Sequence, residues 1–260
     1  MDDSSPDLSR RFGGADRLYG PAGGRALREA HVAVVGIGGV GSWATEALAR
    51  TGVGRITLID LDHVAESNIN RQIQATSETV GMAKIDAMQA RIASINPQCE
   101  VIGVDEFVEP GNWPAILPPG VDGVIDACDQ MRAKVAMAAW ALATGTLFIT
   151  VGAAGGKCHA ERITVGDLSE CTHDPLMAEL RYQLRKHHGA VKAGKRIGLH
   201  CVYSPEPLRS PLTDVSAVDG VWRSDAGLNC KGYGSLVTVT ASCGLVAAGW
   251  MLNNLSGRRE

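Results

Sequence analysis

Short apolar runs alternate with helical patterns along the first 150 residues of the chain. The runs have the length and composition of buried strands, and they span residues 31–35, 55–59, 99–104, 121–127 and 146–151. Apolar residues at helical spacing predict helices at 43–51, 81–95 and 130–144, and a short helix with a loop at 110–119. Strands that alternate with helices predict a Rossmann-like, doubly wound α/β fold with a mainly parallel sheet.

The pattern changes after residue 152. Strands are predicted at 162–165 and 199–203, and a helix at 175–188, so the C-terminal half is expected to extend the sheet with antiparallel strands. Residues 204–231 contain Pro, Ser and Gly without periodicity and are predicted to form a long loop. Residues 1–9 are expected to be loose, and 10–24, where arginines stand among glycines, have no regular pattern and are interpreted as an irregular arm.

Residues 233–252 carry no formal charge over a length close to that of a membrane span. Ser, Thr and Gly dilute the hydrophobicity of this stretch, so a buried strand followed by a helix, at a dimer interface, is the preferred interpretation. We therefore treat residues 1–260 as a single domain without membrane insertion. Its nucleotide-binding half spans about 28–152, and its substrate-binding and dimerisation half about 153–260.

Composition and charge narrow the class of protein. A hydrophobic fraction of 45% with 20% charged residues is ordinary for a globular protein, and a net charge of −3 excludes a global preference for nucleic acid. Any basic surface must therefore be local. Seven cysteines, an odd number spaced singly, indicate free thiols rather than a disulfide framework. No secretory signal is present at the N-terminus, so a cytoplasmic location is expected.

The turn after the first predicted strand has the composition of a phosphate-binding loop. It contains Gly36, Gly38, Gly39 and Gly41 and leads directly into a predicted helix. Glycines let backbone amides approach a phosphate, and the dipole of the helix favours the negative charge. Asp60 ends the second predicted strand, where a carboxylate can hydrogen-bond ribose hydroxyls. Alone, this pattern would suggest NAD.

Two cations and two carboxylates farther along the chain favour ATP instead. Arg71 and Lys84 follow the acidic strand end and can neutralise a triphosphate and its departing pyrophosphate. Lys84 is expected in the first turn of a helix, an unfavourable end for a cation that has no anionic ligand. Asp126 and Asp129 stand where the next strand ends, so we assign Asp129 to Mg²⁺ and a supporting role to Asp126.

The combined motifs resemble those of the adenylating superfamily that contains ubiquitin-activating enzymes and the thiamin and molybdopterin sulfur-carrier activators. The motifs are Gly36-x-Gly38-Gly39-x-Gly41, Asp60-x-Asp62, Asn68-x-x-Arg71-Gln72, Lys84 and Asp126-x-x-Asp129. Within that superfamily the chain looks most similar to the tRNA threonylcarbamoyladenosine dehydratases. The features that carry this closer resemblance are Arg11-Phe-Gly-Gly-x-x-Arg17-Leu-Tyr-Gly20, Gly152-Ala-Ala-Gly155-Gly156, Asp174-Pro-Leu176 and Cys230.

The resemblance implies a ligase-type reaction. ATP would adenylate the threonyl carboxylate of threonylcarbamoyladenosine in tRNA, and a nitrogen of the same modification would then close a ring, releasing AMP. It also implies a homodimer in which an N-terminal arginine, Arg17 in preference to Arg11, reaches the triphosphate of the other subunit. Asn68, Asp62 and Gln72 would complete the nucleotide site, although Asp62 and Gln72 could equally cap turns. A sulfur-transfer protein is a further candidate partner.

Departures from the wider superfamily concern the cysteines. The sulfur-carrier activators usually carry two Cys-x-x-Cys pairs that hold zinc, and no such pair occurs in this chain, so no structural zinc is expected. Cys230 stands beside Lys231, which could lower the pKa of its thiol for thioester chemistry, but an incidental cysteine is the commoner case.

A basic segment supplies the local positive charge that tRNA binding requires. Six cations without an intervening acidic residue fall within sixteen positions, namely Arg181, Arg185, Lys186, Lys192, Lys195 and Arg196. Such a cluster suits phosphate contacts, although a solvated helix face is the alternative. Two other functions stay open, an activator of a ubiquitin-like or sulfur-carrier protein and a nicotinamide-dependent protein. In the second of these, the cations and the carboxylate pair would have no task.

Overall fold

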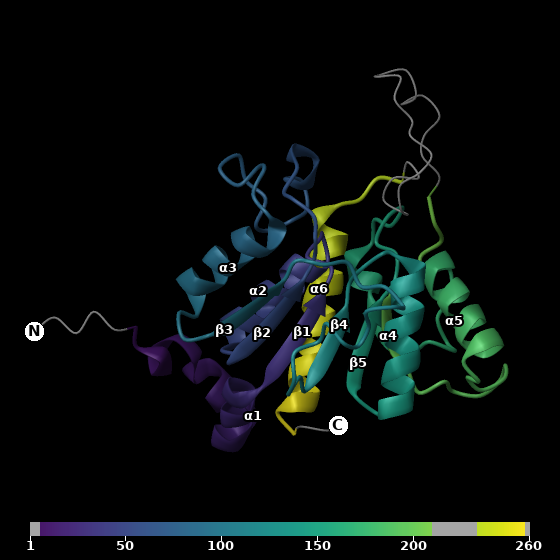
Figure 1. Cartoon of the computed structure of the whole chain (residues 1–260), viewed down its shortest axis with the longest axis horizontal. Helices are drawn as coiled ribbons and strands as arrows, with labels where there is room; N and C mark the ends of the chain where they lie inside the picture. The colour runs from purple at the N-terminus through teal and green to yellow at the C-terminus, as the bar shows by residue number, and fades with distance from the viewer. Residues whose placement is uncertain (1–5, 210–232, 258–260) are drawn as a thin grey trace, which may run out of the picture.

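The computed structural model describes residues 6–209 and 233–257, and a twisted sheet lies at its centre (Figure 1). Within the described residues the sheet has seven strands in the order β3-β2-β1-β4-β5-β7-β6. The strands are β1 (His31–Val35), β2 (Arg55–Ile59), β3 (Glu100–Val104), β4 (Gly123–Asp126), β5 (Leu147–Val151), β6 (Thr164–Asp167) and β7 (His200–Tyr203).

Strand direction confirms the predicted fold class. β1 pairs in parallel with β2 and β4, and β2–β3, β4–β5 and β5–β7 are also parallel. The β6–β7 pair is antiparallel, which is the extension expected for the C-terminal half. The chain winds away from β1 in both directions, so the strand order reverses between β1 and β4. In open α/β sheets this reversal opens a crevice at the carboxyl ends of the strands.

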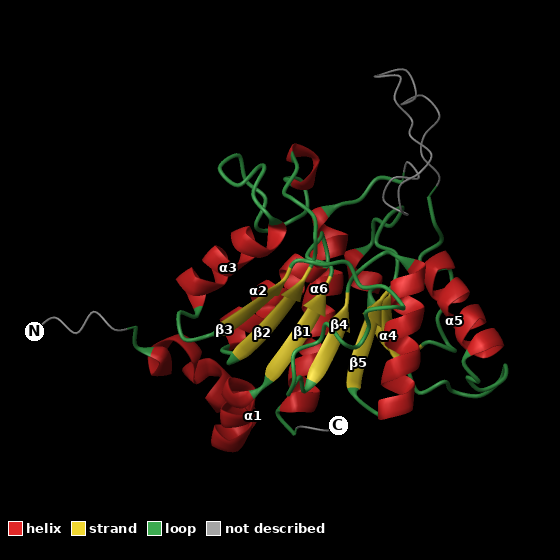
Figure 2. Cartoon of the chain, in the orientation of Figure 1, coloured by secondary structure: helices red, strands yellow, loops and turns green. Residues whose placement is uncertain are grey.

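Helices cover both faces of the sheet (Figure 2). They are α1 (Leu8–Glu29), α2 (Gly41–Thr51), α3 (Lys84–Ile95), α4 (Met131–Thr144), α5 (Pro175–His187) and α6 (Val237–Leu255), with 3₁₀ turns at Glu66–Asn68 and Ala160–Arg162. One face of the sheet packs against α2, α3 and α6, and the other packs against α4 and α5. None of the described helices has both the length and the apolar character needed to cross a bilayer.

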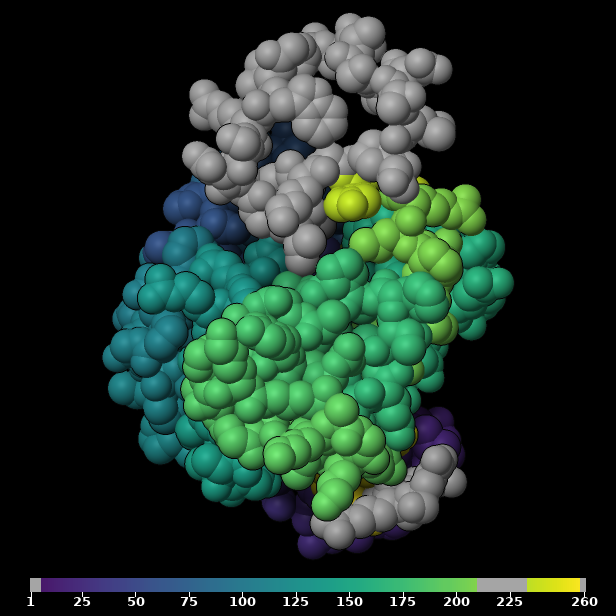
Figure 3. Space-filling view, turned by 90° about the vertical axis from the view of Figure 1, so that its right-hand side faces the viewer, coloured from purple at the N-terminus to yellow at the C-terminus, as the bar shows by residue number. Residues whose placement is uncertain are grey.

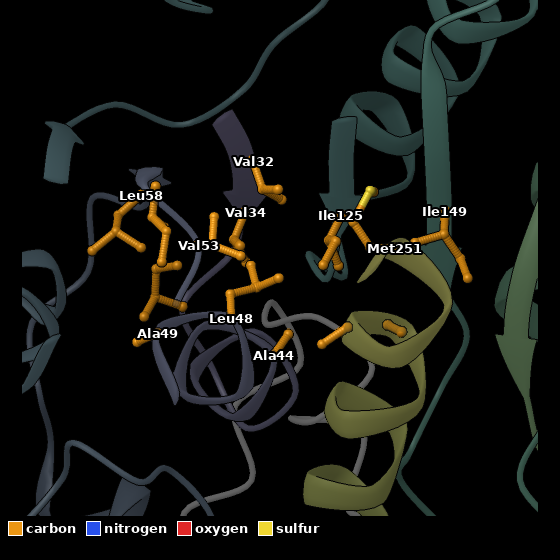
Figure 4. Close-up of a cluster of buried hydrophobic side chains, with 14 of the residues drawn as sticks. Val32, Val34, Ala44, Leu48, Ala49, Val53, Leu58, Ile125, Ile149 and Met251 are labelled. Carbon is orange, nitrogen blue, oxygen red and sulfur yellow. The ribbon is translucent and has the colours of Figure 1, made fainter. Parts of the chain in front are cut away.

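Strand β1 explains why the sheet needs two helical layers. Alternate residues of a strand point to opposite faces, so Val32 and Val34 join the α2–α6 layer while Ala33 and Val35 join the α4–α5 layer. Figure 4 shows Val34 above Leu48 of α2, with Met251 of α6 beside the neighbouring strands. All five residues of β1 are buried, as expected of a central parallel strand.

The N-terminal segment corrects one sequence prediction. Residues 8 and 9, expected to be loose, and residues 10–24, interpreted as an irregular arm, belong to α1, which is interrupted by a non-helical Gly20 (φ 76°) followed by Pro21. Buried Phe12, Gly23 and Leu27 fix the helix against the rest of the chain. Glycine is a poor helix former, but no larger residue fits at position 23, because a Cβ there would lie 2.8 Å from the Tyr19 Cβ and 3.2 Å from the Ser256 carbonyl oxygen.

Three further boundaries differ from the prediction. Residues 110–119 form turns rather than a short helix, and residues 160–162 form a 3₁₀ turn, so that β6 begins only at Thr164. The stretch 233–252 contains no strand, since residues 233–236 have no regular structure and α6 begins at Val237. This helix packs closely on α2, where a Cβ at Gly244 would lie 2.3 Å from the carbonyl oxygen of Val40. Residues 204–209 have no helix or strand, and the rest of the predicted long loop, 210–231, lies outside the described residues.

Candidate active site

A cavity of about 450 Å³ lies at the carboxyl edge of the sheet, at the switch between β1 and β4. Its walls come from the turns after β1, β2 and β4 on one side and from residues 152–155, after β5, on the other. It brings together most of the residues assigned from the sequence, namely Gly36, Gly38, Gly39, Asp60, Asp62, Asn68, Arg71, Gln72, Lys84 and Asp129. A volume of this size is typical of a small-molecule site.

The glycine turn joins β1 to α2 at the cavity. Gly36, Gly38 and Gly39 line the space, whereas Gly41 lies behind it as the first residue of α2. A Cβ at Gly41 would lie 1.8 Å from the carbonyl oxygen of Gly36, so only glycine permits the chain to turn this tightly. The positive end of the α2 dipole therefore points at the cavity, where it favours an anion.

Asp60 forms the floor of the cavity at the end of β2. One carboxylate oxygen accepts the Ile37 N–H at 2.5 Å, and the other accepts the Asp62 N–H at 2.9 Å. Burial raises the pKa of Asp60, while nearby Lys84 and these two N–H donors oppose the rise. The two N–H groups thereby fix the orientation of the Asp60 carboxylate, and its remaining lone pairs can accept hydrogen bonds from the hydroxyls of a sugar.

Lys84 is the first residue of α3, so it lies in the first helical turn, where the sequence predicted it, although the helix begins three residues later than expected; it is only 6% exposed. Its ammonium lies 2.7 Å from Asp62 Oδ2 and 4.0 Å from Asp60 Oδ1. An isolated β-bridge between His63 and Ala83 brings the segment after β2, which contains Asp60 and Asp62, next to the start of α3. The ammonium is thus held at the cavity by carboxylates that an incoming phosphate can partly replace.

Arg71 reaches the cavity from the segment after the 3₁₀ turn. Its Nη1 donates to the Ser67 carbonyl oxygen (2.7 Å) and to Asn70 Oδ1 (2.9 Å), and its alkyl stem lies against Gly39. The indole Nε1 of Trp43, on α2, donates to the carbonyl oxygen of Arg71 at 3.0 Å. Sequence reasoning missed Trp43, because no local pattern links it to a residue 28 positions later.

Polar side chains connect this segment to the glycine turn. Asn68 accepts the Ala65 N–H at 3.0 Å and so caps its own 3₁₀ turn. Buried Gln74 donates to the Ile37 carbonyl oxygen at 2.9 Å and to Gln72 Oε1 at 3.2 Å. These bonds leave the amide nitrogen of Gln72 to face the cavity. Gln74 was also missed from the sequence, since it does not itself line the site.

Asp126 and Asp129 have different environments. Asp126 is fully buried behind the cavity, where it binds Lys134 Nζ at 3.0 Å and Thr150 Oγ1 at 2.6 Å. It therefore supports the site, and it does not line the nucleotide space. Asp129 lies exposed on the cavity rim, and within the described part of the chain its carboxylate has no hydrogen bond or ion pair. A free carboxylate at this edge suits a hard divalent cation such as Mg²⁺.

The outer wall of the cavity contains Phe107 and Val108, two residues that the sequence did not single out. Both follow β3 and provide an apolar surface, while Leu176 and Ala153 line the opposite side of the cavity. An apolar wall beside a sugar-binding carboxylate can accommodate a purine ring. The position of Phe107 and Val108 after the end of β3 was the available signal, because the parallel strands all end at this edge.

Arg11 and Arg17 lie away from the cavity of their own chain. Both are on α1, near the amino ends of the strands, where Arg11 Nη1 donates to the Ile95 carbonyl oxygen at 2.7 Å. Arg17 is exposed. Neither side chain lines the cavity, so an arginine from α1 could contact bound nucleotide only in another copy of the chain.

The basic segment divides into internal and exposed cations. Arg181 donates to the carbonyl oxygens of Leu168 (2.9 Å) and Cys171 (3.0 Å), so this residue stabilises a loop. Arg185 similarly donates to the Val191 carbonyl oxygen (3.1 Å).

Four other cations of the segment remain exposed, and Figure 3 views the molecule from the side on which α5 lies. They are Lys186, Lys192, Lys195 and Arg196. The Nε of Arg196 lies 3.6 Å from Oε1 of Glu170. Lys186 lies in the last turn of α5 and the other three follow the helix, about 20 Å of helix away from its cavity-facing end. Cys230 lies outside the described residues, among which no cluster of three His, Cys, Asp or Glu side chains could hold a metal.

The doubly wound sheet, the glycine turn and the cations around a free carboxylate define a Rossmann-type nucleotide-binding protein. The chain belongs to the ThiF family, whose profile matches residues 14–260. It is 44% identical to the tRNA threonylcarbamoyladenosine dehydratase of Escherichia coli over 253 residues, covering 96% of this chain and 94% of that protein.

Solved structures agree with this assignment. Crystal structures of the E. coli tRNA N6-threonylcarbamoyladenosine dehydratase in complex with ATP and with AMP each match with a TM-score of 0.87 at 42% identity. Each match covers 98% of this chain and 97% of the E. coli chain.

Proposed function

We propose that this protein catalyses the ATP-dependent dehydration of threonylcarbamoyladenosine in tRNA, giving the cyclic form with AMP and pyrophosphate. The observation that carries the proposal is the cavity in which Arg71, Lys84 and Asp129 face the glycine turn, in a chain that matches a dehydratase over nearly its full length. The ATP and AMP complexes of that relative support ATP as the nucleotide.

The chemistry explains why the site needs cations. A carboxylate is a poor electrophile because its leaving group would be oxide, and transfer of AMP onto it creates a leaving group that can depart. Negative charge gathers on the phosphoryl oxygens and on pyrophosphate in the transition state, and fixed cations stabilise that charge. Arg71 and Lys84 take this role, while Asp60 holds the ribose. A nitrogen of the same modification then displaces AMP, so no cysteine nucleophile is needed.

Mg²⁺ fits the residues at the rim. Among the carboxylates that line the cavity, Asp129 is the one with no protein partner in the described residues, whereas Asp62 is bound to Lys84 and Glu106 accepts from Asn112. Asp126, behind the cavity, is bound to Lys134. Asp129 would hold the ion, which would supply charge neutralisation for the triphosphate.

A homodimer is the proposed assembly. Arg17, and Arg11 as the alternative, lie at the edge of the sheet opposite the cavity, so either would serve ATP only across an interface. Light scattering at micromolar concentration checks this proposal, and a fully active monomer would contradict it. A sulfur-transfer partner and a cytoplasmic location stay predictions from the sequence.

The exposed cations in the last turn of α5 and just after this helix are the proposed contact for tRNA. Phosphate contacts release counterions, so affinity should fall log-linearly with salt concentration. The triple substitution of Lys186, Lys192 and Lys195 by alanine should flatten the slope by about 0.7 to 0.9 for each phosphate that no longer binds a lysine. It should leave ATP binding unchanged, because these lysines lie far from the cavity. If the salt titrations of tRNA binding coincide for the wild-type and triple-variant proteins, these lysines do not contact tRNA.

Mass spectrometry of tRNA nucleosides tests the function itself. tRNA that carries threonylcarbamoyladenosine is incubated with the protein, ATP and Mg²⁺ and then digested to nucleosides. The expected product is lighter by one water, and it should be absent without ATP and greatly reduced with the Lys84→Ala variant. If ATP is turned over only when a carrier-protein C-terminus is added, the alternative activator function is correct.

A further inference from the structure

Lys157 is a fully buried lysine on the side of the cavity away from Arg71 and Lys84. It directly follows the turn after β5, and only 1% of the residue is exposed. Its ammonium donates to the backbone carbonyl oxygens of His173 (2.9 Å), Ser204 (3.1 Å) and Glu206. These acceptors belong to two segments that are far apart in the sequence, one before α5 and one after β7.

The geometry determines the charge of this side chain. Three acceptors need three N–H donors, and a lysine has three only as the ammonium ion. Burial lowers the pKa of Lys157, while the carboxylates of Asp174 and Glu206 act in the opposite direction. A charge buried in this way would be costly without partners, and the three carbonyl dipoles provide them.

Glu206 completes a reciprocal clamp. Its carboxylate oxygen Oε2 accepts the N–H groups of Cys158 (2.9 Å) and His159 (3.0 Å), while its own carbonyl oxygen accepts from Lys157. Each charged side chain therefore binds the backbone of the other segment. The segments after β5 and β7 are thus held together by two oppositely charged side chains, each of which binds backbone groups of the other segment rather than the other side chain.

The clamp lies directly behind one wall of the cavity. Gly156 donates its N–H to the Gly234 carbonyl oxygen (2.9 Å), and its carbonyl oxygen accepts the Arg209 N–H (3.0 Å). The neighbours of these partners, Tyr233 and Leu208, line the cavity. Gly156 has a φ of 72°, and a Cβ there would lie 3.1 Å from the Tyr233 ring and 3.2 Å from Leu208.

We propose that Lys157 is a positioning residue that shapes the part of the cavity receiving the tRNA-borne carboxylate and its attacking nitrogen. This inference rests on the proposed function. The hydrogen bonds that organise the ATP side run through Asp60, Trp43 and Gln74 and include no partner of Lys157. Lys157 therefore acts on the acceptor substrate and leaves the nucleotide site intact.

The test separates affinity for ATP from use of tRNA. Lys157→Met keeps an unbranched four-atom stem and removes the ammonium, so three carbonyl oxygens lose their donor and the wall shifts. The KM for modified tRNA should rise about tenfold or more, because small displacements of reacting groups are costly. The Kd for ATP, measured by calorimetry without tRNA, should stay within about twofold, since no hydrogen bond of Lys157 reaches the phosphate-binding residues.

Two variants serve as comparisons. Lys84→Ala should show the reverse pattern, with weakened ATP binding. Arg55→Met removes one partner of an exposed ion pair with Glu100 and should change neither quantity. If Lys157→Met retains the wild-type KM for tRNA, or if it weakens ATP binding as much as it raises that KM, the inference is wrong.

Chemical rescue guards against a variant that folds poorly. Lys157→Ala removes three carbons and the ammonium group, and n-propylammonium supplies these atoms. Added n-propylammonium should lower the raised KM for tRNA in Lys157→Ala and should not change it in Lys84→Ala. Absence of any recovery would overturn the proposal. A wild-type protein that forms no cyclic product would instead reject the proposed function, so the two failures are distinguishable.

Discussion

Removal of one partner from the buried pair of Lys134 and Asp126 should destabilise the fold strongly. Both side chains are 0% exposed, and Lys134 Nζ lies 3.0 Å from Asp126 Oδ2. The ammonium also donates to Thr150 Oγ1 (3.0 Å) and to the Val151 carbonyl oxygen (2.9 Å), which connects α4 to the ends of β4 and β5. Lys134→Met would leave Asp126 as a buried carboxylate without its counter-charge.

Breaking such a pair from one side costs about 3–5 kcal/mol of unfolding free energy. With an m value of about 3 kcal/mol/M, the urea midpoint should fall by about 1–2 M. The assay is equilibrium urea unfolding followed by circular dichroism. Adding Asp126→Asn should recover part of the loss, because it removes the unpaired charge. The matched control is Arg55→Met, whose exposed ion pair is worth at most about 1 kcal/mol. If Lys134→Met loses no more stability than this control, the buried pair does not stabilise the fold as reasoned.

Three other outcomes test the site and the fold. Arg71→Ala should lower turnover about 100-fold, the scale of removing one electrostatic interaction from the transition state, with an unchanged circular dichroism spectrum; wild-type turnover would refute its role. Asp129→Asn should raise the Mg²⁺ concentration for half-maximal activity about tenfold, and an unchanged Mg²⁺ titration would show that Asp129 does not bind the ion. Burial holds the pKa of His31 below its usual 6.5, so the unfolded chain takes up this proton first and stability falls as pH drops below about 6.5. Urea unfolding at pH 8 and 5.5 should show a smaller pH effect in His31→Gln, and an equal effect would exclude His31 as a cause.

The nucleotide half of the site could be predicted from local sequence. A buried strand, a glycine turn, a helix start and an acidic strand end occur within 30 residues, and short-range geometry dictates how they join. The rule that parallel strands end at one edge then brings Asp129 to the same cavity as Asp60. Lys84 could be assigned because a cation at a helix N-terminus is unfavourable unless an anion binds beside it.

The supporting residues could not be predicted in this way. Trp43 and Gln74 act through hydrogen bonds to backbone atoms 28 and 37 residues away in the sequence. Similarly, the glycines of α1 and the Val- and Thr-rich start of α6 have poor helix propensity, and close packing between helices decides their conformation. Local preference is worth tenths of a kcal/mol per residue, roughly, and burial of a whole helix face outweighs it.

The roles of the charged residues show most clearly what the sequence determines and what the fold determines. The sequence determined that a phosphate-binding turn, two cations and an acidic strand end lie in one half of the chain. Only the tertiary structure decided that Lys84 faces the cavity, that Lys134 and Lys157 are buried in structural contacts, and that Arg181 holds a loop. The reason is that a cation's role depends on which oxygens surround it, and here those oxygens come from strand ends and loops distant in the sequence.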